Sequence, residues 1–101
     1  MIVKPVVRDG DVLRVTAALT MNEARAVVEA GLPLLAGGEV VIDLSQVTDA
    51  DSSALAVLYA WQRAQKAAAG TLRVENAPAG LRSIARAYGV GDTLDGLGDG
   101  L

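Results

Sequence analysis

Two short strand segments separated by a long helical pattern constrain the fold of this chain most strongly. The first, Val40-Val41-Ile42, is an apolar run that follows a Gly-Gly turn and ends at an aspartate, which predicts a central strand covered on both faces. The second runs from Leu72 to Val74, roughly to Glu75, and the segment 53–69 between the two predicts a helix that ends at Gly70. Two strands joined by such a helix form a right-handed parallel crossover, so we expect an α/β protein.

The residues before this crossover predict a hairpin and a helix. A stretch from Val3 to Val7 that is rich in β-branched valine and an alternating pattern over 13–19 are joined by Asp9-Gly10, which is typical of a hairpin turn. Thr20-Met21-Asn22-Glu23 matches a capping box, in which the first and last side chains each satisfy a backbone donor. We expect Gly31 and Pro33 to end or kink the helix that begins there.

The residues after the crossover predict one more helix and then a tail. Pro78 suits the start of a helix over 79–88, which Gly89 ends. The expected order is therefore β-β-α-β-α-β-α, giving a mixed four-stranded sheet with about three helices packed mainly on one face. Residues 1–92 are expected to form a single domain. Glycine recurs every few residues in 93–101, so we expect a flexible Gly/Asp-rich tail there.

Composition excludes several classes of function. The 101 residues include no Cys and no His, so disulfides, Cys/His zinc sites and imidazole acid–base chemistry are absent, and we expect neither a cofactor nor an enzyme. Twelve acidic and nine basic residues give a net charge of −3, and the basic residues form no cluster, which argues against nucleic-acid binding. Neither a signal peptide nor an apolar run of ~20 residues is visible, so we expect a cytoplasmic protein.

The segment Asp51-Ser52-Ser53 opens the long helix and is the main candidate site. Asp51 or Ser52 is the natural N-cap, and the free N–H groups of a helix start favour an anion. Two hypotheses follow. The segment caps the helix and does nothing more, or Ser52 carries a phosphate that changes the surface a partner meets.

Two other polar clusters admit a functional interpretation. Asp43 at a strand end, with Asp49 and Asp51, is a conceivable Mg²⁺ site, although such carboxylates more often cap helices or shape turns, and we expect no metal. Arg82 and Arg86 share a face of the last helix, which we expect to be a solvated basic face, with a phosphate or an acidic partner as the alternative.

The long helix is more apolar than a helix on one sheet face requires. Nearly every residue from Ala54 to Trp61 is apolar, whereas such a helix needs only one apolar stripe. Tyr59 and Trp61 point roughly 200° apart around the helix axis, so both cannot face the sheet. We expect one of them to pack inward and the other to lie at a rim or an interface.

These features resemble a STAS domain, the fold of anti-sigma-factor antagonists. The resemblance spans the hairpin to Gly89-Val90, and its strongest part is Val41-Ile42-Asp43-Leu44-Ser45 followed by Asp51-Ser52-Ser53-Ala54-Leu55. In that family a partner kinase phosphorylates the Ser or Thr directly after the Asp, which implies Ser52 here. The family usually has Gly at the position of Ala54. This departure places a bulkier residue at the expected docking site and argues against kinase control.

The sequence is more closely similar to the MlaB-like branch of the family, on residues 51–58, 60–64, 76–78 and 84–90. Proteins of that branch bind the cytoplasmic ATPase of the ABC transporter that maintains outer-membrane lipid asymmetry. The resemblance implies a non-catalytic subunit, peripheral to the inner membrane only through its partners. The implied partner surface comprises Asp51, Ser52, Ser53, Leu55, Tyr59, Gln62 and Arg63. The alternative is a free anti-sigma-factor antagonist, which an anti-sigma kinase would switch by phosphorylating Ser52.

Overall fold

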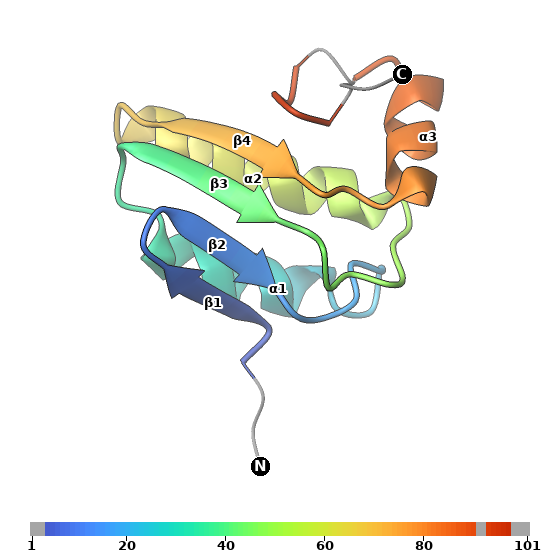
Figure 1. Ribbon diagram of the computed structural model, residues 1–101, viewed down its shortest axis with the longest axis horizontal. Helices are drawn as coiled ribbons and strands as arrows, with labels where there is room; N and C mark the ends of the chain where they lie inside the picture. Colours follow the sequence, from blue (N-terminus) through green and yellow to red (C-terminus); the bar gives the residue numbers. More distant parts are fainter. Residues whose placement is uncertain (1–3, 91–92, 98–101) are drawn as a thin grey trace.

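The structure is a computed structural model that describes residues 4–90 and 93–97, and its centre is a four-stranded mixed sheet in the order β1-β2-β3-β4 (Figure 1). β1 (Val6–Asp9) and β2 (Val12–Val15) form the expected antiparallel hairpin around Gly10. β3 (Glu39–Asp43) is parallel to both β2 and β4 (Thr71–Glu75). The predicted crossover and sheet are therefore confirmed.

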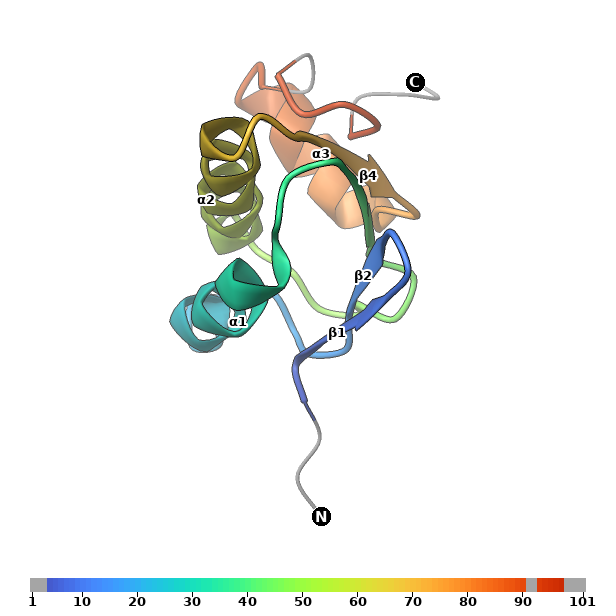
Figure 2. The same cartoon turned by 90° about the vertical axis from the view of Figure 1, so that its left-hand side faces the viewer.

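Two of the three helices cover one face of this sheet. α1 (Ala24–Gly31) ends at Gly31, as expected, and the chain continues into the short 3₁₀ helix η1 (Leu32–Leu34), which contains Pro33. α2 (Ser53–Ala67) lies beside α1 on the same side of the sheet (Figure 2). α3 (Ala79–Ala87) stands beyond the end of β4 (Figure 1). The start of α2 therefore lies at the edge where β2, β3 and β4 end.

β3 is covered on one face only, which corrects the prediction for Val40-Val41-Ile42. Val40 and Ile42 are buried under the helices, whereas Val41 on the opposite face is partly exposed. Because Val41 is apolar although it is partly exposed, the alternation of buried and exposed positions along β3 is not visible in the sequence. No helix of the described chain returns to the other face, which instead carries the ion pairs Arg14–Asp43 and Arg73–Glu75.

β2 is shorter than the alternating pattern predicted. It ends at Val15, although Leu19 is fully buried. Leu19 instead makes an isolated parallel bridge with Ala50, in the loop that leads to α2. The apolar alternation thus predicts correctly that Leu19 is buried. It does not predict where the strand ends, because the chain bends after Val15 toward the β3–α2 loop.

The predicted capping box does not form. Glu23 is the N-cap of α1 and makes no side-chain capping bond. The Thr20 hydroxyl hydrogen-bonds the Glu23 carboxylate, while the Thr20 carbonyl accepts the N–H groups of Glu23 and Ala24 at 3.0 and 2.9 Å. The two side chains satisfy each other across a turn, and residues 20–23 are a folded turn that precedes the helix.

Trp61 joins α1 to α2. It is fully buried, and its indole N–H donates to the Val28 carbonyl at 3.2 Å. A Cβ atom at Gly31 would lie 2.5 Å from the indole ring, so only glycine leaves room for it. Trp61 is thus the inward-facing aromatic of the predicted pair.

Gln65, in the last turns of α2, holds the turns that precede β3 and β4. Its side chain is fully buried. Its carbonyl oxygen accepts the Gly37 N–H at 3.0 Å, and its amide nitrogen lies 3.0–3.2 Å from the carbonyls of Gly37, Gly38 and Thr71. One buried amide therefore satisfies backbone groups of the turn before β3 and of Thr71 at the start of β4, including both polar backbone groups of the buried Gly37.

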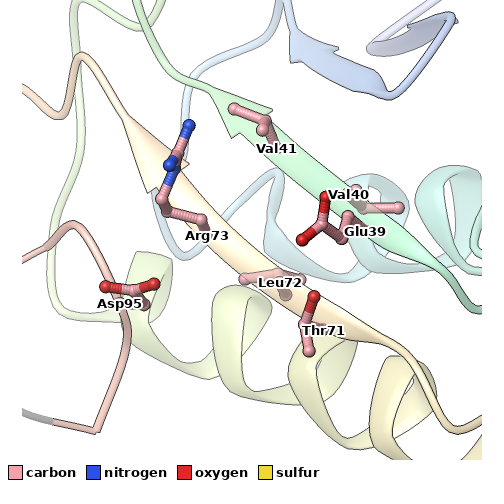
Figure 3. Close-up of a pocket in the computed structure, with 7 residues that line it drawn as sticks. All are labelled: Glu39, Val40, Val41, Thr71, Leu72, Arg73 and Asp95. Carbon is pink, nitrogen blue, oxygen red and sulfur yellow. The ribbon is translucent and has the colours of Figure 1, made fainter.

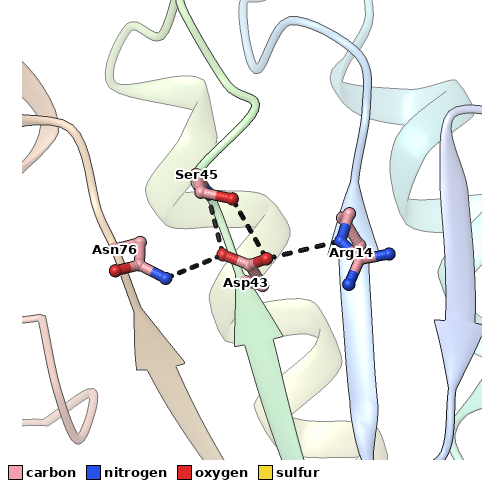
Figure 4. Close-up of polar contacts among 4 residues, drawn as sticks. All are labelled: Arg14, Asp43, Ser45 and Asn76. Atoms are coloured by element: carbon pink, nitrogen blue, oxygen red, sulfur yellow. Dashed lines mark hydrogen bonds and ion pairs between the residues drawn. The ribbon is translucent and has the colours of Figure 1, made fainter.

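Asp43 performs a similar role at the opposite end of the strands (Figure 4). Its carboxylate accepts the Ser45 N–H and hydroxyl at 3.0 and 3.1 Å and the Asn76 amide at 3.0 Å, and it pairs with Arg14 at 3.4 Å. Partial burial by itself raises the pKa of Asp43, but the hydrogen bonds from Asn76, Ser45 and Arg14 outweigh it and lower the pKa. This carboxylate thus ties the ends of three strands together.

Residues 93–97 do not form the expected flexible tail. Leu94 and Leu97 are fully buried, and the Val74 N–H on the outer edge of β4 donates to the Asp95 carbonyl at 2.8 Å. Gly96 has φ +90°, and a Cβ atom there would lie 1.9 Å from the Val74 carbonyl oxygen. Gly96 therefore permits close packing on β4. The expectation of a flexible tail considered only the glycines, whereas Leu94 and Leu97 bury apolar surface that holds the segment in place. Residues 91–92 and 98–101 of the predicted tail lie outside the described residues.

We predict that Gln65→Leu lowers the free energy of unfolding by about 3 kcal/mol, because the shape is kept while several buried backbone groups lose their partners. Urea denaturation measures this change. Gln46→Leu, at an exposed loop position, is the matched control and is expected to change stability by no more than about 0.5 kcal/mol. Equal effects of the two substitutions would contradict the role given to Gln65.

We also predict that the stabilisation due to Asp43 depends on pH. A carboxyl group whose pKa is lowered by folding contributes stability above its unfolded pKa and loses that contribution as the pH falls through its folded pKa. The stability difference between wild type and Asp43→Asn should be full at neutral pH and shrink below about pH 4. Chemical denaturation across this range tests the expectation, and a difference that stays constant with pH would refute it.

Candidate functional site

Two loops that are distant in sequence meet at the start of α2. The Leu19 N–H donates to the Asp49 carbonyl at 2.9 Å, and the Asp51 N–H donates to the Leu19 carbonyl at 3.1 Å. Leu19 itself is buried beneath them. The loop after β2 and the loop after β3 therefore form one continuous surface at this end of the sheet.

The Asp51 carboxylate connects this surface to the helix. One of its oxygens accepts the Ser53 N–H at 2.8 Å, and the other accepts the Met21 N–H at 3.0 Å. Of the two residues predicted as the cap, Asp51 thus supplies the side-chain bond, whereas Ser52 makes none. The N–H groups of Met21 and Ser53 lower the pKa of Asp51, because they stabilise its charged form.

Ser52 lies on this surface with its side chain exposed to solvent. The neighbouring N–H groups are not free to hold an anion, which corrects the expectation that free N–H groups at this helix start favour one. Ser53 donates to the Asp51 carboxylate, Ala54 to the Asp51 carbonyl at 3.0 Å and Leu55 to the Ser52 carbonyl at 3.1 Å. A phosphate on Ser52 would therefore compete with Asp51 instead of filling an empty site.

The structure divides the other predicted site residues into three groups. Arg63 is exposed on α2, and Ser53 is half-buried beneath the cap. Leu55 is only 7 % exposed and belongs to the core, so little of its surface is accessible. Tyr59 and Gln62 face the C-terminal segment of the same chain, which limits what they offer to a partner.

The contacts of Tyr59 show why it is not fully exposed. Its hydroxyl bonds to the Thr93 hydroxyl and lies 3.5 Å from the Val90 carbonyl, while the Gln62 amide donates to the Thr93 carbonyl at 2.7 Å. Tyr59 is half-buried and Trp61 is buried, so the predicted division of the two aromatics is confirmed. The rim at Tyr59 is partly closed by Val90 and Thr93.

Two residues of this surface were missed in the sequence. Ala56 is exposed one turn after Ser52, and Met21 is 76 % exposed in the turn that Asp51 holds. Helical periodicity alone places Ala56 on the same helix face as Ser52, so the sequence could have identified Ala56 as part of this surface. No local pattern connects Met21 to Asp51, which are 30 positions apart.

Ala54 lies elsewhere than the sequence suggested. It is fully buried, so its methyl group faces the core and not the docking surface. The departure from the usual glycine therefore places no bulk beside Ser52 on the surface. The methyl group of Ala54 therefore does not obstruct a kinase that approaches Ser52, contrary to the expectation from the sequence.

The remaining clusters lie outside this surface. Asp43 and Asp51 belong to separate hydrogen-bond sets, and no three metal-ligating side chains gather anywhere in residues 4–90 and 93–97. On α3, Arg86 is exposed as expected, while Arg82 is half-buried with its Nε atom covered.

A hollow of about 140 Å³ opens on the uncovered sheet face (Figure 3), lined by residues of β3 and β4 and by Asp95. It reaches the first residues of β3 and β4, Glu39 and Thr71, and none of the predicted site residues lines it.

Two solved structures share this fold. A proposed anti-sigma factor antagonist from Thermotoga maritima superposes with a TM-score of 0.70 at 15% identity, over 90% of this chain and 82% of its own. The phosphorylated form of the Bacillus cell fate determinant SpoIIAA superposes with a TM-score of 0.59 at 18% identity, over 88% and 86% of the two chains. At such identities the likeness concerns the fold alone. No curated protein matches the sequence.

The sequence itself matches a family at residues 5–98, which includes both loops of the surface and the packed segment 93–97. That family is described as "Mlab, STAS domain". Together with the mixed sheet and its one covered face, this match makes the chain a member of the MlaB STAS domain family.

Proposed function

We propose that this protein is a non-catalytic subunit that binds and supports the ATPase of a phospholipid-transporting ABC transporter, the type that maintains outer-membrane lipid asymmetry. The observation that carries the proposal is the accessible surface at the start of α2. There Ser52 and Ala56 are exposed on the helix, beside a loop surface that Asp51 holds in place. The family match favours this partner over others.

The chemistry of the chain supports a binding role. With no His and no Cys in the sequence, a nucleophile would have to be activated by a carboxylate or a lysine. The carboxylates of Asp43 and Asp51 instead accept hydrogen bonds from neighbouring backbone and side-chain groups. Both are used to hold loops in place, which suits a surface with a fixed shape.

In this proposal the protein reaches the membrane through its partner. No helix in the described part of the chain combines the length and the apolar character that a membrane crossing requires. The subunit would therefore stay on the cytoplasmic side and be peripheral to the inner membrane within the complex.

The second candidate function is a free anti-sigma-factor antagonist controlled by phosphorylation of Ser52. The accessible position of Ser52 favours it, and Ala54, being buried, leaves the surface around Ser52 open. The occupied N–H groups of the first helical turn speak against a preformed phosphate site. We therefore rank this function second.

The first function predicts that Ala56→Arg weakens binding of the ATPase subunit by at least about tenfold, because a long charged side chain is inserted beside Ser52. Ala67→Arg is a matched control. It makes the same change at an exposed alanine on nearly the same face of α2, about 16 Å along the helix. Calorimetric titration of each variant with the purified ATPase subunit gives the affinities. Equal loss in both variants would rule out docking at the start of α2.

The two functions make different predictions for phosphorylation of Ser52 by an anti-sigma kinase and for the phosphate-mimicking variant Ser52→Asp. A phosphorylation switch predicts that an anti-sigma kinase transfers one phosphate to wild type and none to Ser52→Ala, and that Ser52→Asp no longer binds that kinase. The ATPase-subunit function predicts no such transfer. Intact-mass spectrometry after incubation with kinase and ATP, followed by pull-down of each variant, distinguishes them. Capture of the kinase with no binding to the ATPase would overturn the proposed function.

A further inference from the structure

Met21 is an unusually accessible apolar side chain. It is 76 % exposed, compared with 63 % for Tyr88 and 39 % for Val7 and Leu32, the other large apolar residues on the described surface. A single exposed methionine is unremarkable in itself. What distinguishes Met21 is how its backbone is held and what surrounds it.

The turn that carries Met21 is fixed from two directions. Its own N–H donates to the Asp51 carboxylate at 3.0 Å, from the loop after β3. Before it, Leu19 is bonded to that loop, and after it the N–H groups of Glu23 and Ala24, at the start of α1, donate to the Thr20 carbonyl. The Met21 backbone is therefore ordered before any partner arrives, which reduces the entropy lost on binding.

The charge around Met21 is mainly negative. The segments 16–24 and 44–62 contain Glu23, Asp49 and Asp51 but no Lys or Arg, and of the two arginines that follow these segments, Arg25 is paired with Glu29 and Arg63 lies further along α2. Asp49 is exposed, and the N–H group of Met21 itself helps to keep Asp51 ionised by lowering its pKa. A partner that meets this surface is favoured if it carries positive charge around the point of contact.

We propose that Met21 is the apolar anchor of the partner surface, inserting into an apolar pocket of the ATPase that is rimmed by lysine or arginine. The proposal rests on the proposed function, since it concerns the same surface. Methionine suits this role because its flexible thioether side chain adapts to an irregular pocket. Anchors of this kind carry a large share of the affinity when the contacts around them exclude water.

The test compares Met21→Ala with Leu32→Ala, which removes apolar surface from an exposed residue at the other end of α1. We expect Met21→Ala to weaken binding of the purified ATPase subunit about tenfold and Leu32→Ala to change it by less than about twofold. Wild-type affinity should also fall as the salt concentration rises, since opposite charges meet at the rim. Thermal unfolding of both variants verifies that each remains folded.

The outcomes separate this inference from the proposed function. If wild type binds the ATPase and Met21→Ala binds it equally well, the anchor is refuted while the proposed function stands. If wild type binds only an anti-sigma kinase, and that binding depends on Met21, the proposed function fails. In that case Met21 is still part of a partner surface, with the kinase as the partner in place of the ATPase. If wild type binds neither protein, both proposals fail.

Discussion

The structure depends on α2 being held in place at each end by one polar side chain. At its start the Asp51 carboxylate accepts the N–H groups of Ser53 and of Met21 in the loop after β2, and near its end the Gln65 amide bonds to backbone groups of the turn before β3 and of Thr71, the first residue of β4. Between them, Trp61 packs against Gly31 of α1. A helix fixed in this way resists rotation and sliding, because such a movement would break the Asp51 bonds at one end and leave the buried Gln65 amide without partners at the other. The register of α2 therefore determines which of its side chains face outward.

The accessible surface follows from that register. Leu55, Leu58 and Trp61 face the core, so Ser52 and Ala56 are left on the outside of the helix. The same Asp51 that caps the helix also fixes Met21, which adds an apolar side chain to an otherwise polar and acidic region. The shape and charge of this region thus arise from the capping chemistry of one helix, and a partner would meet them already formed.

The C-terminal segment sets the limit of this surface. Thr93 engages Tyr59 and Gln62, and Leu94 and Leu97 close the core beside β4. Residues of α2 that would otherwise be open to a partner are therefore occupied by the chain itself, while Asp95 covers one N–H of the β4 edge. An uncovered strand edge invites pairing with other chains, so this contact also protects the fold.

The sequence by itself determined the order of the elements, the parallel crossover and the helix start at Asp51-Ser52. These depend on local signals, namely hydrophobic periodicity, glycine and proline positions and capping residues, which act over a few neighbouring residues. The same signals failed where distant segments meet. They did not indicate that Gln65 is buried, that Leu94 and Leu97 belong to the core, or that Met21 lies against Asp51. Only the tertiary structure decided these points, because each requires two segments far apart in the chain to supply partners for one another, and local patterns carry no information about which segments come together.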